Sequence, residues 1–164
     1  MVDRERLFRD LDDARALLLA ALEGMTDEDL GRHLPGQAWT VADLLHHITA
    51  WDEVGAATVK AMETGATLDA FVADVDAWNE QIVAARHGQD PGTTLTDLHA
   101  ARERLRSTLV AVPPSLWDQT RTAPGGQPVS LPGICATWTG HDIEHAAELR
   151  VVRDRDPAGG PQTS

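Results

Sequence analysis

Several residue types that often carry function are scarce or missing in this sequence. Tyrosine does not occur, and lysine and cysteine occur once each, as Lys60 and Cys135. A single cysteine excludes an internal disulfide and a thiolate-rich zinc site. Any metal bound by this chain must therefore be held by nitrogen and oxygen ligands.

Positive charge is also scarce. Lysine and arginine together number 14 against 26 acidic residues, and the formal net charge is −12. No run of five or more basic residues offsets this balance, so phosphate backbones and anionic lipid would be repelled. We expect neither a nucleic-acid partner nor a membrane partner.

Long apolar runs are absent as well. No stretch approaches the roughly 18 residues needed to cross a bilayer, and the charged beginning of the sequence leads into an amphipathic pattern. These features predict a cytoplasmic protein. With 164 residues, of which 42% are hydrophobic, the chain suits one domain with a substantial core.

Apolar residues recur at three- and four-residue steps along most of the chain, as amphipathic helices require. Gly, Pro and Asn/Asp-rich segments interrupt this pattern and mark the ends of the helices. The predicted helical regions are 3–24, 26–29, 40–62, 68–88, 96–113 and 132–152. The segment between the fourth and fifth of them, Gln-Asp-Pro-Gly-Thr-Thr at 89–94, is predicted to be a clear break.

The segment 113–133 holds five of the nine prolines and three glycines, so it cannot continue a helix. We expect a long connection with a short turn at 115–117 and a pair of extended segments around Gly125-Gly126. A loop of this length often forms a lid or a wall of a site. The last residues, 154–164, have the composition of a disordered tail, so the folded domain is expected to span 1–153.

Two histidines stand four residues apart near the end of the chain, at His141 and His145. On a helix this spacing places both imidazoles on one face, where both can reach one metal ion. They share the predicted buried stripe of that helix with Trp138 and Glu148. The order His-Asp-Ile-Glu-His is not the His-Glu-x-x-His order of zinc proteases, so a peptidase is disfavoured.

A third histidine comes from the helix at 40–62. Leu44, His47, Ile48 and Trp51 fall within one 100° stripe, whereas His46 lies off it. We therefore expect His47 to face the core and His46 to be solvated. Alone, His47 would be interpreted as a core histidine satisfied by a hydrogen bond. Because His141 and His145 occur as a pair later in the chain, a metal ligand is the better interpretation.

The role of Glu148 stays open at this point. It could fix the tautomer of an imidazole or act as a general base on a metal-bound water. An acid paired with an arginine at the edge of the core is an equally good interpretation. Cys135 is expected to be a small core residue rather than a ligand or nucleophile.

Three arginines follow one another closely on the helix at 96–113, at Arg102, Arg104 and Arg106. Such a cluster could bind an anionic substrate, but it is more typical of a solvated helix face. His87 and His99 follow no ligand spacing and are expected at the surface.

The pattern Trp39-x7-His47-x3-Trp51, together with His141-x3-His145, resembles the DinB/YfiT-like superfamily of metalloenzymes, which includes mycothiol-dependent maleylpyruvate isomerases and bacillithiol or mycothiol S-transferases. The resemblance implies an all-α, up-down-down-up four-helix bundle. It also implies a divalent metal on His47, His141 and His145, with the remaining coordination positions open to water or substrate.

A second resemblance concerns the segment Asp-Ala-Trp-Asn-Glu at 76–80, followed by the arginine-rich helix and the last helix. It is similar to the DfsB/ClbS-like branch, which is related to a colibactin self-resistance protein that hydrolyses a cyclopropane. That branch does not always keep a histidine at the position of His47, whereas this chain does. The metal interpretation therefore survives the comparison.

Three imidazoles suit zinc best, with nickel or iron(II) as alternatives, and an open coordination position is typical of a catalytic metal. A fourth protein ligand, as in a structural site, would have to be Glu148 or Asp43. We expect a substrate pocket beside the metal, lined by Asp43, Trp51, Trp78 and Trp138.

The leading hypothesis is a transferase or isomerase in which the metal activates a low-molecular-weight thiol, with mycothiol favoured. The thiol would attack a small electrophile held beneath the 113–133 loop. One alternative is a metal-hydroxide hydrolase or self-protection protein; another is a non-catalytic bundle that binds a small molecule. Dimers are common among such bundles, so a homodimer is a further expectation.

Overall fold

The structure, a computed structural model, describes residues 2–68 and 74–154. It is predominantly helical, as predicted, with one small sheet. Its elements in chain order are α1 (Arg4–Leu22), α2 (Asp27–Leu30), α3 (Val41–Thr64), α4 (Val75–Arg86), α5 (Pro91–Ala111), the 3-10 turn η1 (Pro114–Leu116), β1 (Thr120–Thr122), β2 (Pro128–Ser130) and α6 (Leu131–Arg153).

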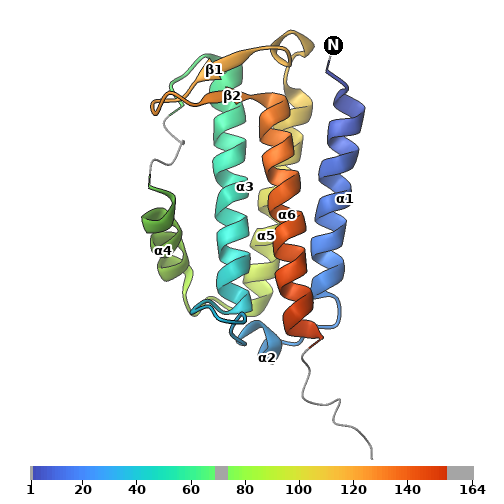
Figure 1. Cartoon of the computed structure of the whole chain (residues 1–164), viewed down its shortest axis with the longest axis vertical. Helices are drawn as coiled ribbons and strands as arrows, with labels where there is room; N and C mark the ends of the chain where they lie inside the picture. Colours follow the sequence, from blue (N-terminus) through green and yellow to red (C-terminus); the bar gives the residue numbers. More distant parts are fainter. Residues whose placement is uncertain (1, 69–73, 155–164) are drawn as a thin grey trace, which may run out of the picture.

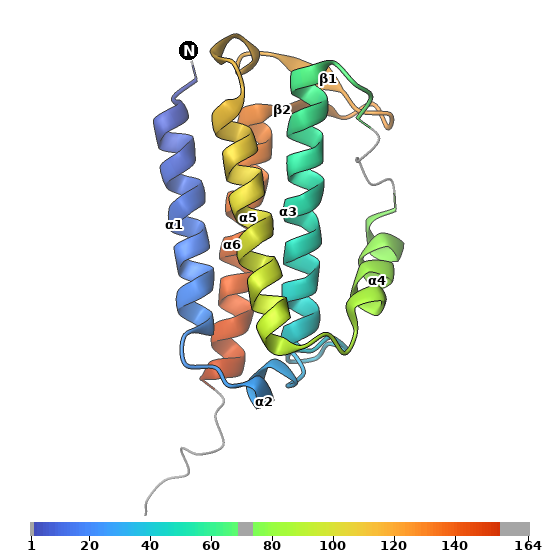
Figure 2. The same cartoon turned by 180° about the vertical axis from the view of Figure 1, so that it is seen from behind.

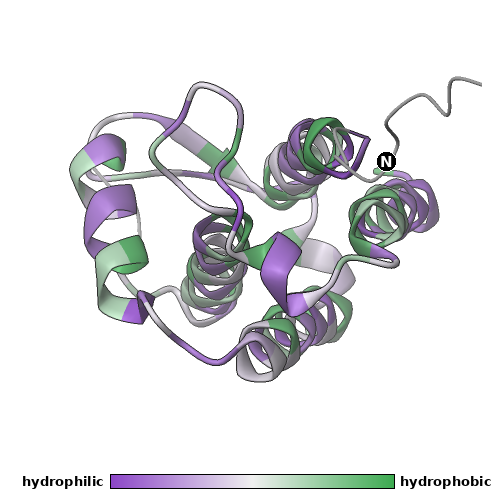
Figure 3. Ribbon diagram, turned by 90° about the horizontal axis from the view of Figure 1, so that it is seen from below, coloured by the Kyte–Doolittle hydropathy of each residue, from purple (hydrophilic) through white to green (hydrophobic). Residues whose placement is uncertain are grey.

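The long helices α1, α3, α5 and α6 run side by side and form a bundle (Figures 1 and 2). α1 and α6 run in one direction, and α3 and α5 run in the other, so the order is up-down-down-up and the predicted fold is confirmed. α1 packs along α6, and α3 packs along α5. Because α3 and α5 are parallel, the chain must return along the bundle between them, and α4 lies on this return, outside the four-helix core (Figure 3).

Side-chain caps fix where the helices begin. At the start of α3, Asp43 donates its backbone N–H to Thr40 Oγ1 at 3.1 Å, and Thr40 donates its own to Asp43 Oδ2 at 2.9 Å. This is the predicted capping box. α6 begins directly after β2, because Ser130 Oγ accepts from the backbone N–H of Gly133 at 3.2 Å. These caps set the phase of the two helices that carry the histidines.

The start of α5 differs from the prediction. The helix begins at Pro91 rather than near Thr96. Asp90 caps it by accepting from the backbone N–H of Thr93 at 3.0 Å, and Pro91 occupies the first position, where proline is favoured. The segment predicted as a break is therefore a helix start.

Two other predictions concern residues outside the described ranges. α4 is described from Val75 onward, and the predicted helix at 69–73 lies outside the described residues. The predicted tail from 155 to 164 lies outside them as well. No described helix combines the length and the apolar character needed to span a membrane.

The connection between α5 and α6 contains a β-hairpin, as predicted. β1 and β2 pair antiparallel, with Arg121 opposite Val129. The turn includes Gly126, whose φ of 84° favours glycine. The Arg121 guanidinium donates to the backbone carbonyls of Ala61 and Ala66 at 2.7 and 2.6 Å. The hairpin is thereby anchored to the C-terminal end of α3, at one end of the bundle (Figure 1).

The core consists of two apolar clusters, one toward the hairpin and one toward α2. The first includes Leu105, Trp117 and Trp138; the second includes Leu98 and Leu149. On each bundle helix, the change from one cluster to the other occurs at a buried charged residue. These residues are Arg15 on α1, Asp52 on α3, Arg102 on α5 and Asp142 on α6.

Candidate metal centre

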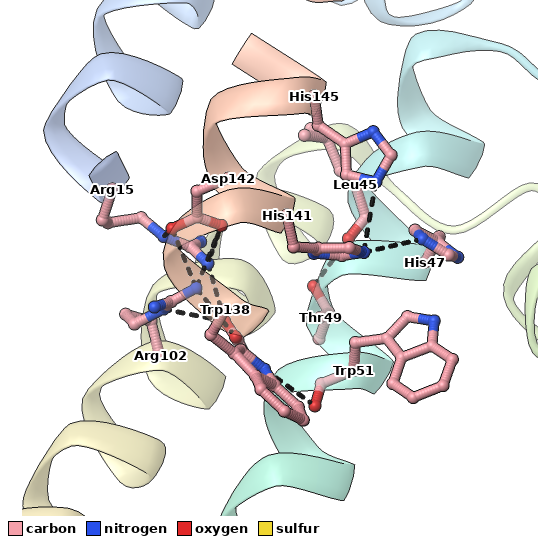
Figure 4. Close-up of polar contacts among 11 residues, drawn as sticks. Arg15, Leu45, His47, Thr49, Trp51, Arg102, Trp138, His141, Asp142 and His145 are labelled. Atoms are coloured by element: carbon pink, nitrogen blue, oxygen red, sulfur yellow. Dashed lines mark hydrogen bonds and ion pairs between the residues drawn. The ribbon is translucent and has the colours of Figure 1, made fainter. Parts of the chain in front are cut away.

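Three histidines from two helices meet between α3 and α6 (Figure 4). The Nε2 atom of His141 lies 3.0 Å from Nε2 of His47 and 3.1 Å from Nε2 of His145. One candidate ligand atom from each residue lies within 4.8 Å of the other two. The structure thus brings together the three histidines that the sequence singled out. They are called the histidine cluster below.

The donor set fits one metal ion. Imidazole nitrogens at about 2.0–2.1 Å from zinc are about 3.3 Å apart in a tetrahedral site and about 3 Å apart in an octahedral one. The two separations from His141 Nε2 in the histidine cluster, 3.0 and 3.1 Å, are close to these values. Within residues 2–68 and 74–154, no fourth His, Cys, Asp or Glu belongs to the group. A bound ion would therefore keep an open coordination position.

Burial keeps the imidazoles of the cluster available as ligands. It lowers the pKa of His47 to about 4 and the pKa of His141 to about 2, and the neighbouring His145 acts in the same direction on both. For His141, the positive charges of Arg102 and Arg15 lower the pKa further. A neutral imidazole keeps a lone pair for a metal. At neutral pH, protons therefore do not compete for these two side chains.

Glu148 orients His145. Its Oε2 accepts a hydrogen bond from His145 Nδ1 at 2.7 Å, and its Oε1 accepts one from Gln37 Nε2 at 3.1 Å. The first bond leaves Nε2 of His145 with the lone pair, on the side of His141. The same bond is the main reason why the pKa of Glu148 is lowered. Glu148 thus contacts a histidine and a glutamine rather than an arginine, in a position that fixes a tautomer.

Two tryptophans, Trp39 and Trp51, border the histidine cluster, and the Trp39 ring centroid lies 5.2 Å from that of His47. The Trp51 ring centroid lies 6.3 Å from that of His47 and 6.4 Å from that of His141. Trp138 donates its indole N–H to the backbone carbonyl of Trp51 at 3.2 Å. The Trp138 ring packs so closely on Gly55 that a Cβ there would lie 2.7 Å from it. A glycine at this position is what allows Trp138 to lie flat against α3.

A cavity of about 250 Å³ adjoins Trp51 and Trp138. Its other walls come from α3, α6, β2 and the first residue of α4, so it lies beneath the 113–133 connection, as expected. The side chains that characterise its walls are Val54, Val129 and Ile134, together with the hydroxyl-bearing Thr58, Ser130 and Thr137. Trp51 and Trp138 both line this cavity, and their role in a substrate pocket stays a prediction.

The other two predicted pocket residues lie elsewhere. Asp43 forms the capping box of α3, and its Oδ1 lies 3.8 Å from His87 Nδ1. Trp78 contacts Trp51, with ring centroids 4.8 Å apart, but lines a separate opening between α3 and α4. Neither lines the cavity beside the histidine cluster: the capping box engages the carboxylate of Asp43, and of α4 only Val75 reaches that cavity.

The prediction that His46 is solvated is wrong. Its side chain is buried, with 2% exposed, and its Nε2 lies 3.0 Å from Thr94 Oγ1 on α5. The buried surface of α3 is wider than one stripe, because α5 packs along a second side of that helix. His46 points to α5 and takes no part in the histidine cluster. The helical phase that separated it from His47 was therefore correct.

The prediction of a solvated arginine face is wrong for Arg102. Its buried guanidinium donates to Asp52 at 3.2 Å and to Asp142 at 3.0 Å. Arg15, from α1, donates to the same two carboxylates at 2.9 Å each. These four residues are called the arginine–aspartate cluster below. The other two arginines of the predicted face are exposed, as expected.

Sequence reasoning missed the arginine–aspartate cluster, in which Asp142 is fully buried. A signal was present. Each of the four charged residues interrupts the apolar stripe of its helix, as Arg102 does between Leu98 and Leu105. A single charge on an apolar stripe in every bundle helix indicates a compensated buried group.

Comparisons with known proteins identify a family and a fold. A family model described as the DinB superfamily matches residues 10–149. No curated protein sequence matches the chain. The fold is similar to that of a mycothiol-dependent maleylpyruvate isomerase, with a TM-score of 0.80 and 14% identity over 90% of this chain and 61% of the isomerase.

A second solved structure is similar along nearly its whole length. It is YfiT from Bacillus subtilis, described as "a probable metal-dependent hydrolase with an unusual four-helix bundle topology", with a TM-score of 0.75 and 20% identity over 94% of this chain and 90% of YfiT. At these identities the two likenesses establish the fold. The chain spans about three fifths of the isomerase.

Proposed function

This chain belongs to the DinB superfamily, and from that premise we propose that it is a metal-dependent enzyme whose centre is formed by His47, His141 and His145. The observation that carries the proposal is the convergence of three Nε2 atoms, without a fourth ligand among the described residues, beside a cavity of about 250 Å³. Three protein ligands and an open position are typical of catalytic rather than structural zinc.

The expected ion is zinc, with nickel or iron(II) as alternatives, because neutral imidazoles suit all three. When bound, such an ion lowers the pKa of a thiol or a water molecule and so supplies a nucleophile at neutral pH. The protein's own residues supply the rest. Glu148 holds His145 in the tautomer that presents Nε2, and the Trp51 ring lies between the histidine cluster and the cavity.

We propose a low-molecular-weight thiol, such as mycothiol, as the nucleophile and a small electrophile as its target. Both carboxylate oxygens of Glu148 are engaged by His145 and Gln37, so this residue is better placed to orient a ligand than to take a proton from water. A thiol has less need of a base, because its pKa starts near 8.5 and falls beside a metal. The activity is then that of a transferase or an isomerase.

A hydrolase is the second candidate, and one observation favours it. The match covers 90% of YfiT but only 61% of the isomerase, so this chain has the extent of the former. In this case a water molecule replaces the thiol, and Glu148 would accept its proton on a lone pair that His145 and Gln37 leave free.

One experiment separates these candidates. Elemental analysis should find about one divalent ion per chain. Zinc-loaded protein is then given 1-chloro-2,4-dinitrobenzene, which yields a thioether with a thiol and dinitrophenolate with water. We expect the thioether, formed only when both the ion and mycothiol are present, with His141→Ala as the inactive control.

The other outcomes are equally informative. Dinitrophenolate formed without a thiol would favour the hydrolase. Loaded protein without either product would favour the non-catalytic binding bundle, and protein that binds no ion would overturn the proposal. Size-exclusion chromatography of the same sample tests the expected homodimer.

A further inference from the structure

We propose that the cavity beside the histidine cluster binds the uncharged, apolar body of a small electrophile, such as a substituted single ring, and excludes anionic substrates. The inference rests on the proposed function for the reaction that follows, whereas the binding preference stands by itself. A preference for uncharged ligands would set this chain apart from the similar isomerase, which is named for a carboxylate substrate.

The walls of the cavity that the described residues form carry no charge. Val54, Val129 and Ile134 form apolar surface, and Trp51 and Trp138 add two indole rings. None of the described residues that line the cavity is Asp, Glu, Lys, Arg or His. A carboxylate that entered would lose its hydration without gaining a partner, which is strongly unfavourable. An uncharged ring would instead stack or pack against the indoles.

The arginines on neighbouring elements are engaged elsewhere. Arg121, on β1, donates to the backbone carbonyls of Ala61 and Ala66. Arg86, on α4, pairs with Glu53 at 3.0 Å. Neither guanidinium lines the cavity. An anionic group in the cavity therefore has no described cation at hand, and the net charge of −12 disfavours its approach as well.

The size of the cavity limits the ligand. An apolar protein cavity of about 150 Å³ holds benzene. The cavity described here, at about 250 Å³, has room for a ring with a few substituents. Trp51 lines the cavity and its ring lies within 6.4 Å of two histidine rings, centroid to centroid, so a single indole ring lies between the cavity and the candidate metal centre.

One hydroxyl in the cavity is free to hold the ligand. Thr58 donates to the carbonyl of Val54 at 2.8 Å, and Ser130 accepts from the N–H of Gly133 at 3.2 Å. Thr137 makes no hydrogen bond to the part of the chain that the structure describes, and it precedes His141 by one helical turn. The Thr137 hydroxyl is therefore placed to donate to a carbonyl or nitro oxygen of an electrophile at the histidine end of the cavity.

The test compares methyl benzoate with benzoate, which share a ring and differ in charge. Binding is followed by NMR through the indole N–H signals of the tryptophans, each assigned by a Trp→Phe variant. We expect methyl benzoate to shift the signals of Trp51 and Trp138 and to leave that of Trp117 unchanged, because Trp117 is buried in the apolar core and does not line the cavity. Benzoate should bind at least about tenfold more weakly.

The preference is measured in the full chain without metal, where a carboxylate cannot coordinate an ion, and then repeated with zinc. Two lysine substitutions, one inside the cavity and one outside it, test this preference further. Thr137→Lys places a cation at the cavity and should tighten benzoate binding roughly threefold to fivefold. Ala136→Lys adds the same charge at an exposed neighbouring position that does not line the cavity, and it should leave benzoate binding unchanged.

The outcomes are distinct from those for the proposed function. Equal affinity for methyl benzoate and benzoate in the metal-free chain would overturn the inference, as would equal effects of Thr137→Lys and Ala136→Lys. Selective binding of methyl benzoate without any turnover by zinc-loaded protein would refute the proposed enzyme while supporting the cavity preference, because the indole signals require neither an ion nor a nucleophile.

Discussion

His141 and Asp142 are neighbours in the sequence, yet they belong to two buried polar clusters on different sides of α6 (Figure 4). Asp142 belongs to the arginine–aspartate cluster, in which each guanidinium faces carboxylates. His141 belongs to the histidine cluster, in which three nitrogens face one another. Both clusters occupy the middle of one bundle, but only in the first do opposite charges compensate one another without a ligand.

The arginine–aspartate cluster is closed and balanced. Each of the four long helices contributes one member, and the four side chains are at most 8% exposed. Burial raises the pKa of Asp52 to about 6, and the two arginines act against this rise. At neutral pH the two positive and two negative charges therefore compensate one another. We infer that the cluster fixes the relative positions of the four helices, because a shift of any one would leave a buried charge unpaired.

The histidine cluster is open. Within the described residues, the Nδ1 atoms of His47 and His141 have no hydrogen-bond partner. Three imidazole nitrogens converge here without a fourth ligand among the described residues, and such an arrangement is typical of a site that binds a metal ion. The comparison shows that burial of a polar group does not identify its function; the charge of the groups that it faces is the better guide.

The largest effect is expected from opening the closed cluster. Arg102→Met keeps much of the side-chain length but leaves Asp52 and Asp142 short of a partner. The free energy of unfolding, measured by urea denaturation, should fall by about 3–5 kcal/mol.

Arg106→Met is the matched control on the same helix. It breaks an exposed ion pair with Asp12, at 2.8 Å, and should cost less than about 1 kcal/mol. Equal losses for Arg102→Met and Arg106→Met would mean that the arginine–aspartate cluster is not what distinguishes the interior of this bundle.

The second prediction separates the two adjacent histidines of α3. His47→Ala removes one proposed ligand and should weaken zinc binding by more than about 100-fold. Loss of a residue that only hydrogen-bonds to a ligand already costs up to that factor. Calorimetric titration with zinc measures this change.

His46→Ala serves as the control. It should leave zinc affinity nearly unchanged but lower the free energy of unfolding, because His46 is buried against Thr94. A loss of zinc binding in His46→Ala, or none in His47→Ala, would contradict the assigned ligand set.

A smaller effect is expected from Glu148→Gln, which retains the size of the side chain but removes its charge. The protein should keep its ion, and kcat/KM should fall roughly tenfold, because His145 becomes a weaker electron donor. Glu148→Asp should restore part of the rate if the carboxylate acts through His145. Full metal content with a full rate in Glu148→Gln would assign this residue to structure only, and would leave a thiol as the favoured nucleophile.

The features predicted correctly from the sequence depend on local patterns. The capping box of Thr40 and Asp43, the four-residue spacing of His141 and His145, and the glycine turn of the hairpin each act within a few residues. The phase of α3 distinguished His47 from His46 for the same reason. The DinB/YfiT-like resemblance then supplied the topology, which no local pattern contains.

The features that were missed depend on contacts between helices. Arg102 resembles its exposed neighbours Arg104 and Arg106 in sequence, and only its partners on α3 and α6 make it a buried residue. The solvated position predicted for His46 assumed that α3 buries a single stripe. In the structure, α5 covers a second side of α3. The packing of Trp138 on Gly55 likewise joins two helices, and a single glycine within a helix gives little sign of its partner.

The smallest effect is expected from removing a histidine in the absence of metal. His141→Ala in metal-free protein should change the free energy of unfolding by less than about 1 kcal/mol, because the lost packing is offset by removing a buried nitrogen without a partner. Urea denaturation in the presence of EDTA measures it, with Arg102→Met as the reference. A loss as large as that of Arg102→Met would show that the histidine cluster also supports the fold. A change near zero, combined with loss of zinc binding, would show that removing His141 abolishes binding while the bundle stays intact. The two neighbours on α6 would then have separate roles, with His141 binding the metal and Asp142 stabilising the fold.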